Sequence, residues 1–132
     1  MSALYPLFKE ALLTAQINMM TDVIKVQAVS AAYVYSAAHQ YLSSVPAGAR
    51  IGSAVTLASK SISGGAFDAA DATIPAPSGD PITALVLYRE GANDGASNLI
   101  AYLNGYSRFP VSPIGIDLPI VWNDDLYKIF AL

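Results

Sequence analysis

One stretch, residues 81–106, constrains the fold more than any other part of the chain. It predicts two strands, Ile82–Arg89 and Asn98–Leu103, joined by the loop 90–97. The first strand is apolar on both faces up to its final arginine, which indicates a central strand with a packed layer on each side. The loop contains Asn93, Asp94 and Gly95, residue types that tolerate turn geometry. We therefore expect an antiparallel hairpin at the centre of a β-rich domain.

The N-terminal part predicts one helix and one strand. Apolar side chains recur at helical spacing and Pro6 suits a first helical turn, so a helix is expected over about residues 6–15. Residues 23–29 alternate, which predicts a strand with Lys25 and Gln27 on a solvated face. Residues 33–35 continue the β character, and Ser36 is a candidate cap for a further short helix over 37–42.

The remaining segments predict short strands. Residues 54–61 form one strand, residues 63–65 a turn, and residues 66–68 and 72–74 short edge pieces. Proline cannot donate a ladder hydrogen bond, so the stretch with Pro75 and Pro77 and the strand 116–122 with Pro119 belong at sheet edges. Residues 123–125 are expected to turn the chain into a closing strand over 127–132.

These elements predict a mainly β fold in a single domain spanning residues 1–132. The expected architecture is an antiparallel β-sandwich-like domain or a partial barrel, with the N-terminal helix and one further short helix. The expected core residues are Leu12, Ile24, Val26, Leu57, Val86, Leu87, Ile100, Leu103 and Trp122.

Composition points to contacts with other chains. Charged residues make up 13% of the sequence, against about 25% in an ordinary soluble domain. Hydrophobic residues make up 54%, more than a small domain can hide in one core, so we expect part of the surface to be buried against other chains. The alternative is that abundant alanine inflates this hydrophobic content. A net charge of −3 without a Lys/Arg cluster argues against nucleic-acid binding.

Residues 26–49 contain no charged residue, but polar residues, proline and glycine interrupt the run. A membrane span needs ~20 predominantly apolar residues, so we expect no membrane association.

No catalytic, cofactor or metal motif is recognisable in the sequence. His39 is the single histidine, cysteine is absent, and there is no Gly-x-Ser-x-Gly motif or phosphate-binding glycine loop. A structural role is therefore expected for His39. The aspartates fall in predicted turns without calcium-loop spacing. We expect no enzymatic activity, no cofactor and no metal. The eight tyrosines could form a sugar-stacking platform, although core or interface packing is their ordinary role.

The order of several segments resembles a family of small structural proteins of tailed bacteriophages. The segments are Leu4-Tyr-Pro-Leu-Phe-Lys-Glu-Ala-Leu-Leu13, Asp22-Val-Ile-Lys-Val-Gln-Ala-Val29, Ala37-Ala-His-Gln-Tyr-Leu42 with Pro46-Ala47 and Ala49-Arg50, Gly65-Ala-Phe-Asp-Ala-Ala-Asp-Ala-Thr73, Ala84-Leu-Val-Leu-Tyr88, Leu99-Ile-Ala-Tyr102 and the ending from Trp122 to Leu132. The resemblance covers nearly the whole chain and brings no catalytic residues. It implies a virion component of the head or tail.

Within that class, the expected function is that of a capsid cement or decoration protein on the outer surface of an icosahedral head. Its partners would be the major capsid protein and further copies of itself, since many symmetric attachments reinforce one another. The candidate interfaces are the N-terminal helix, the stretch 74–77 and the loop 107–113. Their candidate contact residues are Leu4, Leu7, Phe8, Ile74, Pro75, Pro77, Phe109, Pro110 and Pro113. The alternatives are a tail or neck component, and a virion-associated carbohydrate-binding module.

Overall fold

The structure is a computed structural model that describes residues 3–105, 108–122 and 129–132. Its largest element is a five-stranded antiparallel sheet with the order β1 (Ala3–Leu4), β8 (Asn98–Leu103), β7 (Ile82–Arg89), β2 (Ile24–Ser30) and β3 (Arg50–Thr56). The predicted hairpin is confirmed with both strand boundaries, and β7 is the central strand of the sheet.

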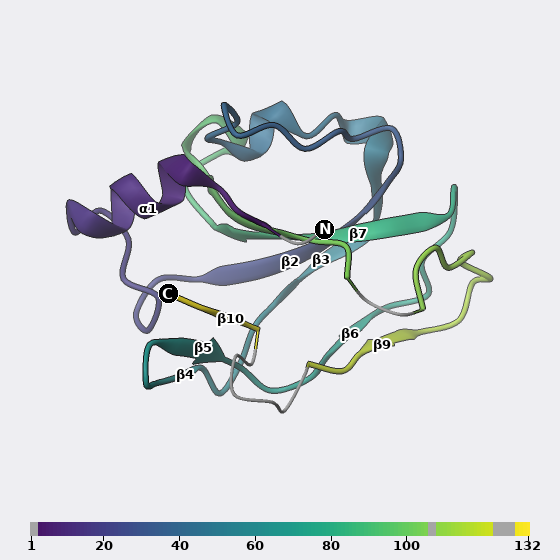
Figure 1. The fold of residues 1–132 in the computed structure, drawn as a ribbon. Helices are drawn as coiled ribbons and strands as arrows, with labels where there is room; N and C mark the ends of the chain where they lie inside the picture. The colour runs from purple at the N-terminus through teal and green to yellow at the C-terminus, as the bar shows by residue number, and fades with distance from the viewer. Residues whose placement is uncertain (1–2, 106–107, 123–128) are drawn as a thin grey trace.

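Two smaller antiparallel sheets complete the β structure of the described residues. Strands β4 (Ser61–Ser63), β5 (Ala66–Asp68) and β10 (Phe130–Ala131) form one of them, with β5 in the middle. Strands β6 (Ala72–Ile74) and β9 (Leu118–Ile120) pair to form the other. Figure 1 shows β4, β5 and β10 at one end of the molecule and the β6–β9 pair toward the opposite end.

Helical structure is sparse in the part of the chain that the structure describes. The helix α1 spans Pro6–Leu13, ending two residues before the predicted limit. Three single-turn 3₁₀ helices follow: η1 (Leu42–Ser44), η2 (Ala47–Ala49) and η3 (Asp94–Ala96). Over the described residues, none of the helices has the length and apolarity needed to cross a bilayer.

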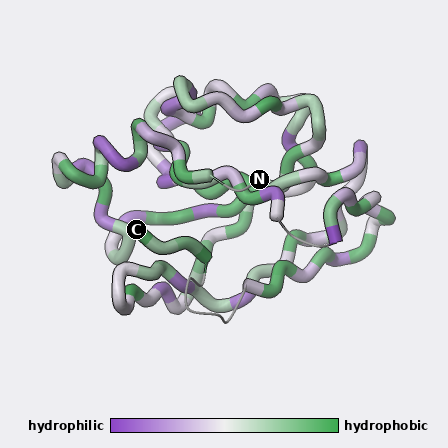
Figure 2. The backbone as a smooth tube through the Cα atoms, in the orientation of Figure 1, coloured by the Kyte–Doolittle hydropathy of each residue, from purple (hydrophilic) through white to green (hydrophobic). Residues whose placement is uncertain are grey.

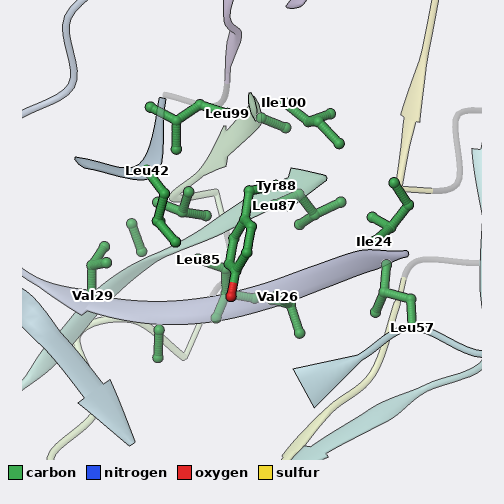
Figure 3. Packing of buried hydrophobic residues seen from close by; sticks show 14 of the residues in the cluster. Ile24, Val26, Val29, Leu42, Leu57, Leu85, Leu87, Tyr88, Leu99 and Ile100 are labelled. Atoms are coloured by element: carbon green, nitrogen blue, oxygen red, sulfur yellow. The ribbon is translucent and has the colours of Figure 1, made fainter. Parts of the chain in front are cut away.

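The core lies on both faces of the five-stranded sheet. In Figure 1 the segment carrying η1 and η2 crosses one face, and the smaller sheets lie beyond the other face. Figure 2 shows hydrophobic residues along the central strands, interrupted in places by hydrophilic ones. In Figure 3, Leu42 and Leu57 lie on opposite sides of β2, and both are buried. This layered, antiparallel arrangement confirms the sandwich-like, mainly β fold.

The predicted core is largely confirmed. Seven of the nine residues named from the sequence are buried, namely Ile24, Val26, Leu57, Val86, Leu87, Ile100 and Trp122. The other two, Leu12 and Leu103, are half-buried and pack against the same cluster. Strands β5 and β6 also begin and end at the predicted residues, but the prediction that β5 is an edge strand is wrong, because β4 and β10 pair with it on both sides. Between β4 and β5, Gly64 and Gly65 have φ values of 58° and 79°, as a tight hairpin turn requires.

The prediction of a solvated face on β2 is wrong for Gln27, which is buried. The register between β2 and β3 shifts here, so that Gln27 lies opposite an irregular stretch of β3. The Gln27 side-chain amide donates to the carbonyls of Ile51 and Gly52, 3.2 and 3.1 Å away. The side chain therefore replaces ladder hydrogen bonds that the irregular strand cannot make.

The predictions for residues 33–42 are also wrong. Residues 33–35 form no strand. Instead of a helix over 37–42 there is one turn, in which the Ser36 hydroxyl accepts a hydrogen bond from the backbone of Ala38. The chain then runs extended beside β8, where the Leu42 N–H donates to Ser97 and the Gln40 carbonyl accepts from Leu99. Because β8 occupies these backbone groups, the segment cannot continue as a helix.

Strand boundaries differ elsewhere. The strand predicted over 54–61 is divided between β3, which begins at Arg50, and the separate β4. Strand β9 is shorter than predicted, and Pro119 lies in a two-stranded pair, where its missing donor is tolerated. The predicted turn 123–125 and the start of the closing strand at 127–128 lie outside the described residues. The end of that strand is β10.

Candidate interface surfaces

Two of the three predicted interface segments, residues 74–77 and the loop 107–113, contribute to one hollow through Pro77 and residues 108 and 111–113, while Ser107 lies outside the described residues. The chain that follows the loop also pairs with the first segment. The β6–β9 pairing joins residues 72–74 to residues 118–120. Beyond it, the Ala76 N–H donates to Asp117 Oδ1 at 3.0 Å and the Gly115 N–H donates to the Pro77 carbonyl at 3.2 Å. We call the surface formed by residues 74–77 and 108–119 the proline end.

Backbone contacts fix the proline end to the main sheet. Ile82, the first residue of β7, exchanges two backbone hydrogen bonds with Val111, at 2.8 and 3.0 Å. On the other side, β6 packs so closely over β3 that a Cβ on Gly52 would lie 2.9 Å from Ile74 Cγ2. A hollow of about 190 Å³ lies within this end, between Pro77, Pro113 and neighbouring side chains.

The proline end exposes several apolar side chains. Ile114 is 74% exposed and Ile116 is 64% exposed. Pro75 and Pro110 are exposed as well, while Phe109 and Pro113 are half-buried. The peptide bond between Phe109 and Pro110 is cis. Apolar groups exposed side by side are typical of surfaces that contact another molecule.

A second apolar surface, which we call the helix groove, is bordered by α1 and the three-stranded sheet. Figure 1 shows these elements at the end of the molecule opposite the β6–β9 pair. The helix groove is a hollow of about 420 Å³ between the end of α1 and the three-stranded sheet. Its lining residues are Leu12, Ala15, Ile17, Asn18, Met19, Ile62, Gly65, Phe67, Phe130 and Leu132. Ile62 is 52% exposed, and the neighbouring Leu13 on α1 is also exposed.

The predicted contact residues divide into surface and core. Pro75 and Pro110 are exposed, and Leu4, Leu7, Phe109 and Pro113 are half-buried. The remaining three, Phe8, Ile74 and Pro77, are buried in the fold. The Phe8 ring packs edge-on against Phe130 at a centroid distance of 5.9 Å. The side chains of these three residues therefore face the interior of the domain and not its surface.

A tyrosine cluster, which the sequence does not reveal as a unit, joins the N-terminus to the end of β8. The ring of Tyr35 lies 4.9 Å from that of Tyr5 and 5.5 Å from that of Tyr102, measured between centroids. Tyr33 completes the cluster, 5.9 Å from Tyr102. These residues come from three separate segments, so sequence spacing alone gave no signal that they meet.

A hydrogen-bond chain runs through the interior of this cluster. The Tyr5 hydroxyl lies 2.6 Å from the Tyr33 hydroxyl, which lies 2.9 Å from His39 Nδ1. Donation from Tyr5 to Tyr33, and from Tyr33 to His39 Nδ1, satisfies both hydroxyl hydrogens. Burial, followed by the hydrogen bond to Tyr33, raises the pKa of Tyr5 far above its ordinary value. Burial likewise raises the pKa of Tyr33.

The described residues show no group of three or more His, Asp or Glu side chains placed to hold a metal ion. Comparison with protein-family models and with curated proteins found no match to this chain.

Proposed function

We propose that this chain is a structural component of a tailed-bacteriophage virion, a decoration protein that stabilises the icosahedral head. It binds the outer surface of the capsid as a homo-oligomer. The observation that carries the proposal is the pair of exposed apolar surfaces at opposite ends of a small β domain. The resemblance of the ordered sequence segments to small phage structural proteins indicates the class of assembly.

A decoration protein needs two kinds of contact, one with the major capsid protein and one with its own copies. The proline end and the helix groove supply two separate surfaces for these contacts. A standard interface buries about 800 Å² on each partner. The molecule has 6609 Å² of accessible surface, so both contacts fit on one subunit.

The fold suits a role that is mechanical rather than chemical. Many copies attached across the seams of a pressurised shell reinforce one another, because attachment at several points raises the effective concentration. This role requires no catalytic group, cofactor or metal, and it involves neither nucleic acid nor a membrane.

Purified virions test the proposal. Quantitative mass spectrometry should find hundreds of copies per particle, immunogold labelling should decorate the head, and particles without the protein should release DNA at a lower temperature. A copy number near a dozen with label confined to tails would instead support the runner-up, a tail or neck component. That alternative would use the same exposed apolar surfaces at lower copy number.

A further inference from the structure

A hollow of about 410 Å³ opens beside the tyrosine cluster, and no part of the proposed function uses it. Its volume falls within the range of about 300–1,000 Å³ found for small-molecule sites. The lining comes from the loop after β2, from the start of β7 and from the end of β8. The lining residues are Ala31, Tyr33, Val34, Tyr35, Thr83, Tyr102 and Asn104.

Two buried tyrosines support the aromatic side chains that line this hollow, which we call the tyrosine hollow. Tyr5 and Tyr33 are buried and joined by their hydroxyl groups. Tyr35 and Tyr102 pack against them and remain half-buried, so part of each ring is left for the hollow. Rings fixed in this way offer apolar surface to a ligand at little cost in conformational entropy.

Asn104, one of the polar residues that line the hollow, carries an acceptor without a donor. Asn104 Oδ1 is buried, and no donor among the described residues reaches it. A buried carbonyl oxygen without a hydrogen bond is unfavourable, and a ligand hydroxyl that donates to it would remove this cost. The hydroxyl group of Thr83, which is half-buried, lies in the same lining.

Among the described residues, no charged side chain lines the hollow. A ligand that carries a phosphate or carboxylate would find no counter-charge there, and the net charge of −3 further disfavours anions. The ligand chemistry that fits combines an apolar face, hydroxyl donors and no charge.

We propose that the tyrosine hollow binds a neutral pyranose ring of a glycan. The C–H face of the sugar packs on Tyr35 and Tyr102, and a sugar hydroxyl donates to Asn104 Oδ1. The inference does not depend on the decoration role, because it concerns a surface apart from both the proline end and the helix groove.

NMR titration of ¹⁵N-labelled protein tests the proposal. The probes are the methyl glycosides of glucose, galactose, mannose and N-acetylglucosamine, each at up to about 50 mM to cover millimolar dissociation constants. At least one glycoside should give saturable shifts at Tyr35, Thr83, Tyr102 and Asn104. Adenosine is the competing probe, because a nucleoside is also flat and neutral.

Three variants locate the site. Tyr102→Ala and Asn104→Leu should each weaken binding by at least about tenfold, which corresponds to losing one good contact. Tyr41→Ala, which changes a half-buried tyrosine outside the hollow, should bind as the unmodified protein does. If Tyr102→Ala does not fold, Asn104→Leu still decides, because it removes the acceptor while keeping a side chain of similar size.

The proposal is overturned if no glycoside gives saturable shifts in the hollow, if Asn104→Leu binds as tightly as the unmodified protein, or if adenosine alone binds. None of these outcomes affects the copy number or the location of the protein in virions. The glycan site and the decoration role can therefore be rejected independently of each other.

Discussion

The hydroxyl groups of Tyr5 and Tyr33 lie 2.6 Å apart in the interior, and they do not depend on each other equally. Tyr33 has a second partner in His39, whereas Tyr5 is 0% exposed and bonds through its hydroxyl to Tyr33. Tyr33→Phe should therefore destabilise the protein by about 1–3 kcal/mol, because it leaves a buried hydroxyl without a partner. Tyr5→Phe should cost less. Urea unfolding of both variants measures the difference, and equal losses would contradict this asymmetry.

Alkaline pH should destabilise the protein through the same residues. Burial raises the pKa of Tyr5, Tyr33 and Tyr88 in the folded state. Their stabilising contribution is complete below the unfolded tyrosine pKa of about 10, and it is lost as pH rises from there toward the folded pKa.

Each such tyrosine contributes a slope of up to about 1.4 kcal/mol per pH unit above pH ~10. Urea unfolding at pH values from about 8 to about 11 measures the slope of the unfolding free energy against pH. The absorbance of tyrosinate follows the ionisation of the tyrosines. Tyr5→Phe should flatten the curve. An unchanged slope in that variant would show that Tyr5 does not carry the effect.

Gly52 should not tolerate a side chain. Its φ is +72°, and a Cβ would lie 2.9 Å from Ile74 Cγ2 and 3.1 Å from Pro77 Cβ. Gly52→Ala should therefore cost about 1–3 kcal/mol in the free energy of unfolding. The matched control is Gly48→Ala, since nothing lies within 4 Å of a Cβ there. That variant should stay within about 0.5 kcal/mol of the unmodified protein.

Arg50 should contribute much more to the free energy of unfolding than Asp94, the carboxylate with which it pairs. Its guanidinium donates to the carbonyls of Leu42 and Val45, at 3.0 and 2.9 Å, and to Asp94 at 2.9 Å. Arg50→Ala should cost about 2–3 kcal/mol, because it removes charge-assisted bonds that hold η1. Asp94→Ala should cost at most about 1 kcal/mol, since its carboxylate is exposed. Thermal and urea unfolding compare the two, and a larger loss for Asp94→Ala would refute this order.

Charge placed on either apolar surface should weaken virion attachment without unfolding the domain. The variants are Ile116→Asp on the proline end and Ile62→Asp at the helix groove. Each should lower the affinity of the protein for phage heads that lack it by at least about tenfold. Sedimentation of the free protein then separates loss of self-association from loss of capsid contact. Thr56→Asp, at an exposed polar position, is the control and should bind normally. Full occupancy by both isoleucine variants would remove these surfaces from the proposal.

The sequence predicts the central hairpin well because local information determines it. Ile82–Arg89 is apolar on both faces, and its loop contains residues suited to turns, so pattern and turn chemistry agree. The bounds of the strands at 66–68 and 72–74 were also predictable, since Gly65 precedes the first and Pro75 follows the second.

The errors arise where distant segments decide the structure. Gln27 is buried because its side chain donates hydrogen bonds to the carbonyls of residues 51 and 52. The alternating pattern of β2 cannot predict partners that lie on another strand. Residues 37–42 favour a helix locally, yet hydrogen bonds to Ser97 and Leu99 hold the chain extended from Gln40 to Leu42. For the same reason the tyrosine hollow, assembled from residues 31–35, 83 and 102–104, could not be predicted.

The three sheets should differ in how readily they open. Strand β7 has a hydrogen-bonded neighbour on each side and a packed layer on each face, so its amides should exchange with deuterium only through global unfolding. The β6–β9 pair has only two strands, so fewer backbone hydrogen bonds must break for it to open. Local opening there would let the proline end adapt to a curved shell, whose local geometry varies from site to site, while the five-stranded sheet keeps its shape.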